Sequence, residues 1–581
     1  MSVDQEVASL QTAPSPPPSQ AAADASTSAE GATPAAQAPV AEVERLGSVF
    51  APLHERDFRA LWSAALVSNI GTWMQNVGGA WLMTSLTPSP LAVALMQTAT
   101  SLPIFLIGLP AGALADLVDR RRLLLIAQTW MLIAAGLLGF LTLAGLTTPW
   151  LLLALTFALG LGTALNAPAW QAVVPETVPA PKLPAAIALN SASFNLARAL
   201  GPALGGLVVA TVGPAVNFLL NAVSFLGTIV VLARWRPRRR TSHLPGERLV
   251  GATRIGIRYA RHAPELRAVL VRCAAFISCA SALWALLPLV ARNQLGLSSS
   301  GYGLLLAALG LVAVAGTSVL PRLRAQFSVH QQVAGSSLVF AAGTLALGLL
   351  PNPIAVCGAL FLTGVAWMVA TAGLNVTAQT CVPKWVMARA LATYLLVFQG
   401  VLAGGSMLWG LVAERVGESL ALAVAAGCML IGIVISRRWR LETDQHLDLS
   451  PSSHLVDPSL RGKDAPDPEE GPVLVTAEYR VRSEAAGEFI AAMREVGRLR
   501  RRDGAMRWGL FRDPTDHVRY LESFVIESWA EHLRQLERAT VADRAIEEHA
   551  RSFLVESETP IVSHLVAARP PGETEPVTIG V

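Results

Sequence analysis

One arginine, Arg198, lies well inside a long apolar stretch of the sequence, residues 185–211, that holds no other charged side chain. A helix over this stretch would bring Arg198 about 20 Å from its start, at ~1.5 Å per residue. The same helix face would carry Asn190, Phe194 and Gly201. A cation in apolar surroundings needs a partner or a cavity. Two roles stay open: binding an anionic or polar ligand, such as an acidic or catechol-type compound, or a structural hydrogen bond to a neighbouring helix.

Other polar side chains in the apolar stretches also fall at helical spacing. Asn69, Trp73 and Asn76 share one stripe at positions i, i+4 and i+7. Asn375 and Gln379 form a similar pair four residues apart. Such residues can contact a ligand, or they can bond one helix to the next, which is worth about 0.6 kcal/mol each in a membrane.

The composition indicates the surroundings in which these residues must work. Of the 581 residues, 52% are hydrophobic and 15% are charged, whereas soluble domains carry about 25% charged residues. The mean hydropathy is +0.47. Twelve continuous apolar stretches approach the ~20 residues that a helix needs to cross a bilayer. They are residues 58–85, 91–115, 123–146, 149–173, 185–211, 215–233, 269–291, 301–320, 332–351, 354–382, 390–413 and 419–436.

Basic residues gather in alternate loops between these stretches. One side carries Arg120–Arg122, Lys182 and the basic run 234–240, whereas the other side carries little more than Arg292 and Arg415. Because cytoplasmic loops of membrane proteins are enriched in Lys and Arg, both termini are predicted to be cytoplasmic.

The two sets of six stretches repeat each other. Gly201 and Gly213 recur 204 positions later as Gly405 and Gly417. Parallel six-helix repeats with a ligand site between them are a transporter architecture. The fold class predicted is therefore an all-α membrane protein of two six-helix bundles.

The two ends of the chain differ from this apolar centre. The first 48 residues are rich in Ala, Pro, Ser and Thr and are expected to be disordered. After residue 471 the pattern becomes that of a soluble β-α-β-β-α-β unit, the ferredoxin-like order. The domains predicted are 1–48 (tail), 49–236 (first bundle), 237–265 (basic linker), 266–440 (second bundle), 441–471 (linker) and 472–570 (cytoplasmic ferredoxin-like α+β domain).

Three motifs carry a family resemblance. Gly112-Ala-Leu-Ala-Asp116-Leu-Val-Asp119-Arg120-Arg121 resembles the cytoplasmic loop signature of the major facilitator superfamily, with Leu117 and Asp119 as departures. Gly201-Pro202-Ala-Leu-Gly205-Gly206 resembles the core of its antiporter signature. His54-Glu-Arg-Asp-Phe-Arg-Ala-Leu-Trp62 looks like the enterobactin-exporter-like branch, the transmembrane secretion effectors. The tail resembles antibiotic-biosynthesis monooxygenase domains.

This resemblance implies a twelve-helix fold with a central cavity lined by the first, fourth, seventh and tenth spans. The acid and basic residues of the loop signature would pair and separate as the protein changes conformation, or would only anchor the topology. The candidate substrate-binding residues are Arg198, Asn69, Trp73, Asn76, Asn166, Gln171, Asn190, Trp284, Asn375 and Gln379. The candidate conformational residues are Gly112, Asp116, Arg120, Arg121, Gly201, Pro202, Gly205 and Gly206.

The function predicted is secondary active export of a siderophore-like or drug-like small molecule across the bacterial inner membrane, coupled to an ion gradient, with a proton as the candidate ion. No Walker motif is present, which argues against an integral ATPase. No catalytic residue, cofactor, metal or nucleic-acid partner is expected. The alternatives are an importer of the same fold and a bifunctional protein whose C-terminal domain senses or modifies the cargo. Dimerisation through that domain is a further expectation.

Overall fold

The computed structural model describes residues 50–236, 258–439, 448–450, 452, 466–555 and 558–568. Side chains are not described at 113, 116, 117, 312–321 and 324. The chain divides into two parts, Met1–Ser48 and Val49–Val581. The predicted disordered tail 1–48 lies outside the described residues, as do 237–257 of the basic linker and most of the linker 441–471. All statements below concern the second part.

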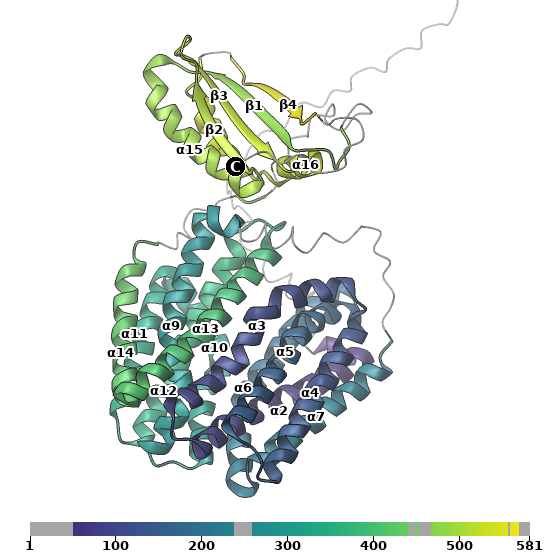
Figure 1. Cartoon of the computed structure of the whole chain (residues 1–581), viewed down its shortest axis with the longest axis vertical. Helices are drawn as coiled ribbons and strands as arrows, with labels where there is room; N and C mark the ends of the chain where they lie inside the picture. Colours follow the sequence, from purple (N-terminus) through teal and green to yellow (C-terminus); the bar gives the residue numbers. More distant parts are fainter. Residues whose placement is uncertain are drawn as a thin grey trace, which may run out of the picture. The chain divides into compact units, whose positions relative to one another are not determined.

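Helices of 19 to 31 residues make up the larger portion of this part (Figure 1). The first half comprises α2 (Arg56–Leu86), α3 (Pro90–Leu117), α4 (Arg120–Leu143), α5 (Pro149–Thr177), α6 (Leu183–Val212) and α7 (Pro214–Arg234). The second half comprises α9 (Pro264–Asn293), α10 (Ser299–Gln326), α11 (Val329–Leu349), α12 (Pro353–Thr380), α13 (Met387–Val416) and α14 (Glu418–Ser436).

Matching glycines end two of these helices. Gly213 has φ +90° after α6, and Gly417 has φ +84° after α13. Glycine adopts this left-handed conformation without steric cost and is the usual residue at a helix C-terminus. These are the two glycines that stand 204 positions apart in the sequence, so the sequence repeat corresponds to a repeated turn in the structure.

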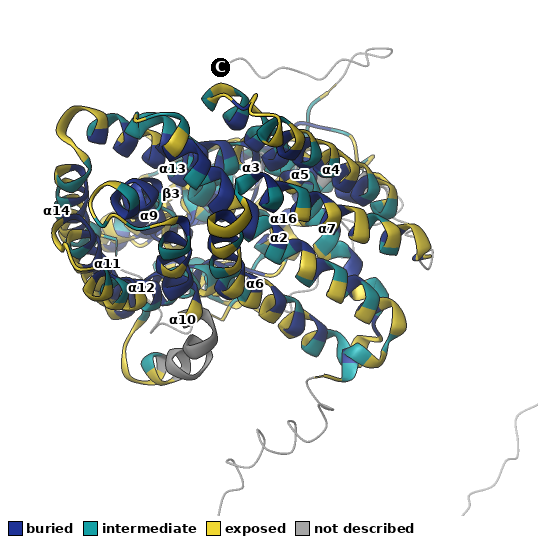
Figure 2. Ribbon diagram, turned by 90° about the horizontal axis from the view of Figure 1, so that it is seen from below, coloured by how far each residue is buried: buried dark blue, intermediate teal, exposed yellow. Residues whose placement is uncertain are grey.

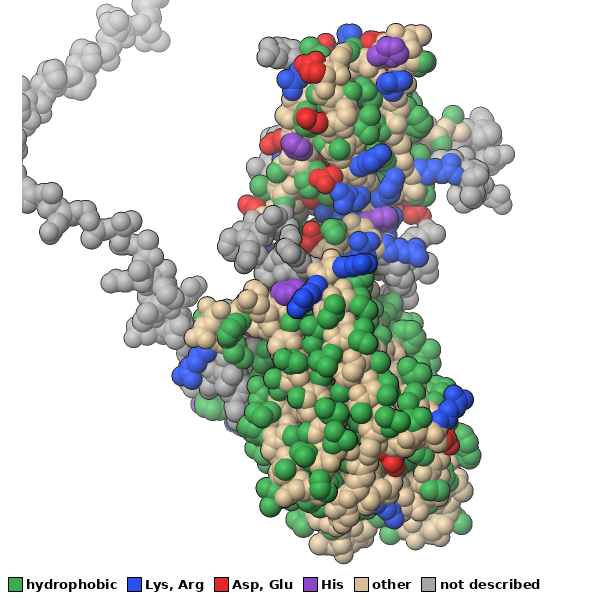
Figure 3. Space-filling view, turned by 90° about the vertical axis from the view of Figure 1, so that its left-hand side faces the viewer, with side chains coloured by type: hydrophobic (Ala, Val, Ile, Leu, Met, Phe, Trp, Pro, Cys, Tyr) green, Lys and Arg blue, Asp and Glu red, His purple; other side chains and the backbone are tan. Residues whose placement is uncertain are grey.

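Ten of these helices are long and apolar enough to cross a membrane, judged on the described residues. The two others are α2 and α10, and the latter contains the shorter apolar segment Ser299–Leu311. Apolar side chains dominate the surface of the helical bundle that Figure 3 shows, with few charged ones. This surface is suited to lipid, since water would favour a far higher share of charged residues.

The two halves meet along two helix pairs. α6 packs along α10, and α3 packs along α13. Within the halves, α4 and α2 pack on α7, and α11 packs on α12 and α14. Buried residues follow the inner faces of these helices, as seen along the bundle in Figure 2.

The C-terminal domain contains a four-stranded antiparallel sheet. Its elements are β1 (Val473–Arg480), α15 (Ala486–Asp503), β2 (Arg507–Arg512), β3 (Arg519–Ile526), α16 (Trp529–Arg538), α17 (Val541–Arg551) and β4 (Ile561–Val566). The strand order β2-β3-β1-β4 is that of a ferredoxin-like fold. Alternate residues of β1 are buried, as expected for a sheet covered by helices on one face. The α+β character predicted from the sequence is therefore confirmed.

Candidate functional site

Arg198 and Trp284 face each other from opposite halves of the bundle. The guanidinium carbon of Arg198 in α6 lies 5.8 Å from the ring centroid of Trp284 in α9, which is a cation–π contact. The Nε atom of Arg198 and the Nε1 atom of Trp284 are both buried and have no hydrogen-bond partner among the described residues. Each half therefore contributes one unused N–H donor to this contact, and such donors can bind a ligand with acceptor oxygens.

The glycine motif of α6 brings this helix close to α2. A Cβ atom at Gly205 would lie 2.7 Å from the Cα of Met74, and one at Gly201 would collide with the side chain of Trp73. Backbones can approach this closely only where side chains are missing.

The same motif also brings α6 against α10 of the other half. A Cβ atom at Gly206 would lie 3.0 Å from the Cα of Gly303, and one at Gly303 would lie 2.5 Å from the carbonyl oxygen of Pro202. Further along, a Cβ at Gly310 would lie 2.5 Å from the carbonyl oxygen of Arg198. Close packing of the halves therefore fixes the backbone at Arg198. A conformational role for the motif stays a prediction.

The remaining candidates of the first half divide into packed and exposed residues. The ring of Trp73 makes an edge contact with Phe194, with centroids 6.4 Å apart. Asn166 accepts a hydrogen bond of 3.0 Å from Gln128, so it bonds α5 to α4. Two of the other candidates, Asn69 and Asn190, are half-buried, whereas Asn76 and Gln171 are exposed.

In the second half, the predicted pair Asn375 and Gln379 is joined directly. The Nε2 atom of Gln379 donates to Oδ1 of Asn375 at 2.6 Å, within one helix. Trp284 packs edge-on against Trp367 of α12, with centroids 5.4 Å apart. The structure brings Arg198 and Trp284 together, but it gives no direct contact between Arg198 and the Asn375–Gln379 pair.

A group of side-chain contacts joins the two halves at one end of the bundle, and it was not predicted from the sequence. At the bundle face opposite the one where α2 begins, here called the distal face, Arg292 of α9 lies 5.7 Å from the ring of Trp81 in α2. It also donates to Oγ1 of Thr84 at 3.0 Å. Trp81 stacks on Tyr302 of α10 at 5.9 Å. We call Trp81, Thr84, Arg292 and Tyr302 the distal latch; its sequence signal was Arg292, an arginine on the side poor in basic residues.

At the opposite face, here called the proximal face, the basic residues of the predicted loop signature bind within the first half. Arg120 pairs with Glu176 of α5 at 2.5 Å. Arg121 donates from Nε to the carbonyl oxygen of Leu232 in α7 at 2.9 Å. No described side chain approaches a Cβ placed on Gly112 within 4 Å. The side chain of Asp116 lies outside the described residues, so its predicted pairing stays a prediction.

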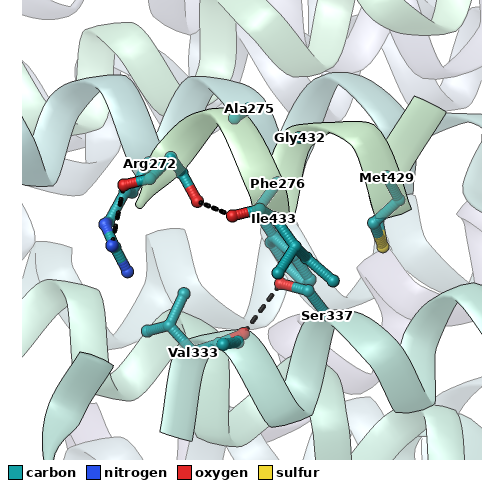
Figure 4. A pocket seen from close by; sticks show the side chains of 10 residues that line it. Arg272, Ala275, Phe276, Val333, Ser337, Met429, Gly432 and Ile433 are labelled. Atoms are coloured by element: carbon teal, nitrogen blue, oxygen red, sulfur yellow. Dashed lines mark hydrogen bonds between the residues drawn. The ribbon is translucent and has the colours of Figure 1, made fainter. Parts of the chain in front are cut away.

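Two cavities of the described residues lie within the second half. One is lined by Arg272, Phe276, Val333, Ser337 and Met429 (Figure 4). Its volume of about 20 Å³ is enough for a water molecule but not for a ligand. Arg272 closes it by donating from Nε to the carbonyl of Trp439 at 2.6 Å and from Nη2 to that of Ser436 at 2.8 Å.

A larger cavity of about 290 Å³ lies between α9 and α14. It is lined mainly by apolar side chains together with Ser278, Cys279 and Cys428. Because α14 packs on α9, α11 and α13 of its own half, this cavity belongs to the second half and not to the contact between the halves.

The fold agrees with comparisons to known proteins. Residues 47–571 match the family described as transmembrane secretion effector, MFS_3. This match covers most of the chain, so the chain belongs to this family of major facilitator transporters. It is a multi-pass transporter of the membrane.

Characterised and uncharacterised relatives share about a quarter of their residues with the chain. The uncharacterized MFS-type transporter YfiS of Bacillus subtilis is 25% identical over 65% of this chain and 92% of its own length. The staphyloferrin A transporter of Staphylococcus aureus is 21% identical over 66% and 97%. The enterobactin exporter EntS of Shigella boydii is 26% identical over 65% and 90%.

Solved structures support the fold alone. A POT family transporter in complex with 5-aminolevulinic acid superposes with a TM-score of 0.56 at 12% identity, over 66% of this chain and 97% of its own. A bacterial homologue of the lysosomal transporter Spinster, in an inward-facing conformation, gives 0.53 at 14% identity, over 67% and 96%.

Proposed function

We propose that this protein is a secondary active exporter of a small, siderophore-like or drug-like molecule. It spans the bacterial inner membrane twelve times, with both termini and the proximal face in the cytoplasm. The cargo moves by alternating access, as the two six-helix halves rock about a central site. The names of its relatives support export, because they include an enterobactin exporter. The basic residues of the proximal loops support the orientation.

The observation that carries this proposal is the contact between Arg198 and Trp284. The two residues belong to different halves, and each has a buried N–H group without a partner in the described part of the chain. A carboxylate or phenolate oxygen bound beside the guanidinium would accept from Nε of Arg198 and neutralise its charge. The indole ring offers a face for an aromatic cargo. The cargo class supported by this geometry is therefore an anionic, preferably aromatic, small molecule.

The closed distal latch supports alternating access. It joins the halves through a cation–π contact, a ring stack and a neutral hydrogen bond. Contacts of this kind are weak individually and can break and re-form during a transport cycle. The driving ion is proposed to be a proton, which rests on the resemblance of Gly201-Pro202-Ala-Leu-Gly205-Gly206 to the antiporter signature of the superfamily.

A strain that lacks the gene provides the test. The compound that disappears from its culture medium identifies the cargo, and plasmid-borne variants are then compared for its secretion. Arg198→Gln should reduce export at least tenfold without lowering the amount of protein in the membrane. Arg198→Lys should retain part of the activity because it keeps the positive charge. It should not retain all of the activity, since it lacks the N–H group at Nε.

The matched control is Arg267→Gln, which removes an exposed arginine from the start of α9 and should leave export unchanged. Export at the wild-type rate in Arg198→Gln would exclude this arginine from the transport site.

A further inference from the structure

Two aromatic side chains mark the place where the second half meets the C-terminal domain. Tyr259 lies just before α9 and is 2% exposed, and Trp385 lies in the turn between α12 and α13. Their rings meet edge to face, with centroids 5.8 Å apart. Both positions belong to the proximal face of the second half.

Two arginines of the C-terminal domain cover these rings. The guanidinium of Arg538 lies 4.4 Å from the ring centroid of Trp385, and that of Arg502 lies 5.5 Å from Tyr259. Both arginines are buried. Buried cations on aromatic faces attract more strongly than exposed ones, because water no longer competes for the charge.

Acidic residues of the same domain hold the two arginines in place. Arg502 pairs with Asp503 and Asp543, each at 2.7 Å. Arg538 pairs with Glu531 at 2.6 Å. Their guanidinium planes are thus set by the domain itself and are presented to the rings in a fixed orientation.

In a third contact the arginine belongs to the second half and its partners belong to the domain. Arg258, next to Tyr259, donates from Nη1 to the carbonyl oxygen of Gly504 at 3.3 Å. Its Nη2 lies 3.7 Å from Oε1 of Glu531. Burial lowers the pKa of Arg258, and the charge of Glu531 opposes this shift.

Opposite charges face each other at this contact. The domain contributes the two buried arginines and the three buried acids Asp503, Glu531 and Asp543. Arg258 supplies the third positive charge. We call Arg258, Tyr259, Trp385, Arg502 and Arg538, together with these acids, the proximal clamp.

The clamp anchors the end of a helix that also touches the first half. Trp385 stands two residues before α13 begins at Met387. α13 packs along α3 of the first half, where a Cβ at Gly400 would lie 2.6 Å from the ring of Phe105. If the distal side opens by rocking, the proximal ends of the halves must shift past each other at this helix pair. A fixed α12–α13 turn opposes that shift.

We propose that the C-terminal domain, docked through the proximal clamp, favours the state in which the distal side is closed, and that release of the domain favours distal opening. A contact that is stronger in one of two conformations stabilises that conformation by the difference between the contact's free energies in the two. The distal latch is closed in the same structure that forms the clamp. This inference gives the C-terminal domain a regulatory role and rests on the proposed alternating access, but its test needs neither cargo nor transport.

The test measures distances by pulsed electron paramagnetic resonance on the full-length protein in lipid nanodiscs. Spin labels on Ala144→Cys and Ser298→Cys, two exposed distal positions in opposite halves, report distal opening. A second pair, Arg437→Cys in the second half and Glu488→Cys in the domain, reports docking; both positions are exposed. The native cysteines are replaced by Ala in all samples.

The clamp is broken from the side of the second half, so that the ion pairs within the domain stay intact. Arg258→Gln with Trp385→Leu should broaden the distribution of docking distances. It should also increase at least threefold the fraction of molecules that have the longer distance between the distal labels. Arg261→Gln with Lys384→Gln is the matched control, because these exposed neighbours make no clamp contact. It should leave both distributions as in the wild type.

Either of two results would overturn the proposal. If the docking distance stays as in the wild type, the clamp contacts do not hold the domain. If the domain is released and the distal distances do not change, docking does not bias the transport conformation. Neither result depends on export, so the proposed function and the clamp can fail separately.

Discussion

In the first half of the bundle, buried amide side chains bond one helix to the next, whereas in the second half aromatic rings pack into a continuous cluster. Asn217 of α7 donates from Nδ2 to the carbonyl oxygens of Met74 and Gly205, both at 3.0 Å. In the second half, Trp367 of α12 lies within 6.0 Å of the ring centroids of Phe276, Trp284, Phe340 and Phe398.

The sequence repeat between the two halves shows this contrast at individual positions. The positions 204 residues after Asn217 and Asn221 are Ala421 and Ala425 of α14, and both alanines are buried. The same turn geometry at Gly213 and Gly417 therefore leads into two helices that are held in different ways. Hydrogen bonds fix helix register through direction, whereas aromatic packing fixes it through shape. Fold symmetry thus does not require chemical symmetry.

The contrast also explains how the two members of the proposed site are supported. Arg198 stands on α6, whose backbone at Gly205 is bonded by Asn217. Trp284 stands at the edge of the aromatic cluster, against Trp367. Arg198 and Trp284 are therefore supported in different ways, by hydrogen bonding of a helix backbone and by aromatic packing.

The largest effect is expected at the centre of the aromatic cluster. Trp367→Ala should lower the free energy of unfolding by about 3–5 kcal/mol, because it leaves a cavity among four rings. Denaturation of the purified protein in mixed micelles measures this loss. Phe361→Ala, on an exposed face of the same helix (Phe361 is 41% exposed), is the control and should cost far less. Equal losses for the two variants would mean that the cluster does not stabilise the second half.

A smaller effect is expected at the amide that joins three helices of the first half. Asn217→Ala removes two hydrogen bonds and should cost about 1–2 kcal/mol, the range for polar contacts between membrane helices. The same denaturation assay measures it. Asn76→Ala removes an exposed amide and should be neutral for stability. A loss for Asn217→Ala as large as that for Trp367→Ala would remove the proposed difference between the halves.

The helices and strands could be predicted from the sequence because their signals are local. The apolar stretch 185–211 corresponds to α6, Leu183–Val212, and the predicted order of strands and helices along the chain is present in the C-terminal domain. Helical spacing also predicted that Arg198 shares a helix face with Phe194 and Gly201. In the structure, Trp73 of α2 packs on Phe194 and on Gly201.

What the sequence could not provide were the partners across the halves. The contact of Arg198 with Trp284 depends on how α6 and α9 lie against each other, which no spacing within either helix encodes. The same holds for Arg292, whose partner Trp81 is 211 positions away, and for the clamp around Trp385. For Arg198 and Arg292 the signal was a charged residue in an unfavourable place, but this signal did not identify the partner; for the clamp no signal was found in the sequence.

The smallest effect concerns a single hydrogen bond, and it tests whether the amides of the first half act in pairs. Nδ2 of Asn221 donates to Oε1 of Gln75 at 2.6 Å, and both side chains are buried. A double-mutant cycle of Gln75→Ala and Asn221→Ala should give a coupling energy of about 0.6 kcal/mol, the average for such bonds inside membranes. The cycle of Gln75→Ala with Asn76→Ala, an exposed neighbour, should give no coupling. If Gln75 and Asn221 also fail to couple, their hydrogen bond does not stabilise the first half beyond side-chain packing. The difference between the two halves would then rest on Asn217 alone.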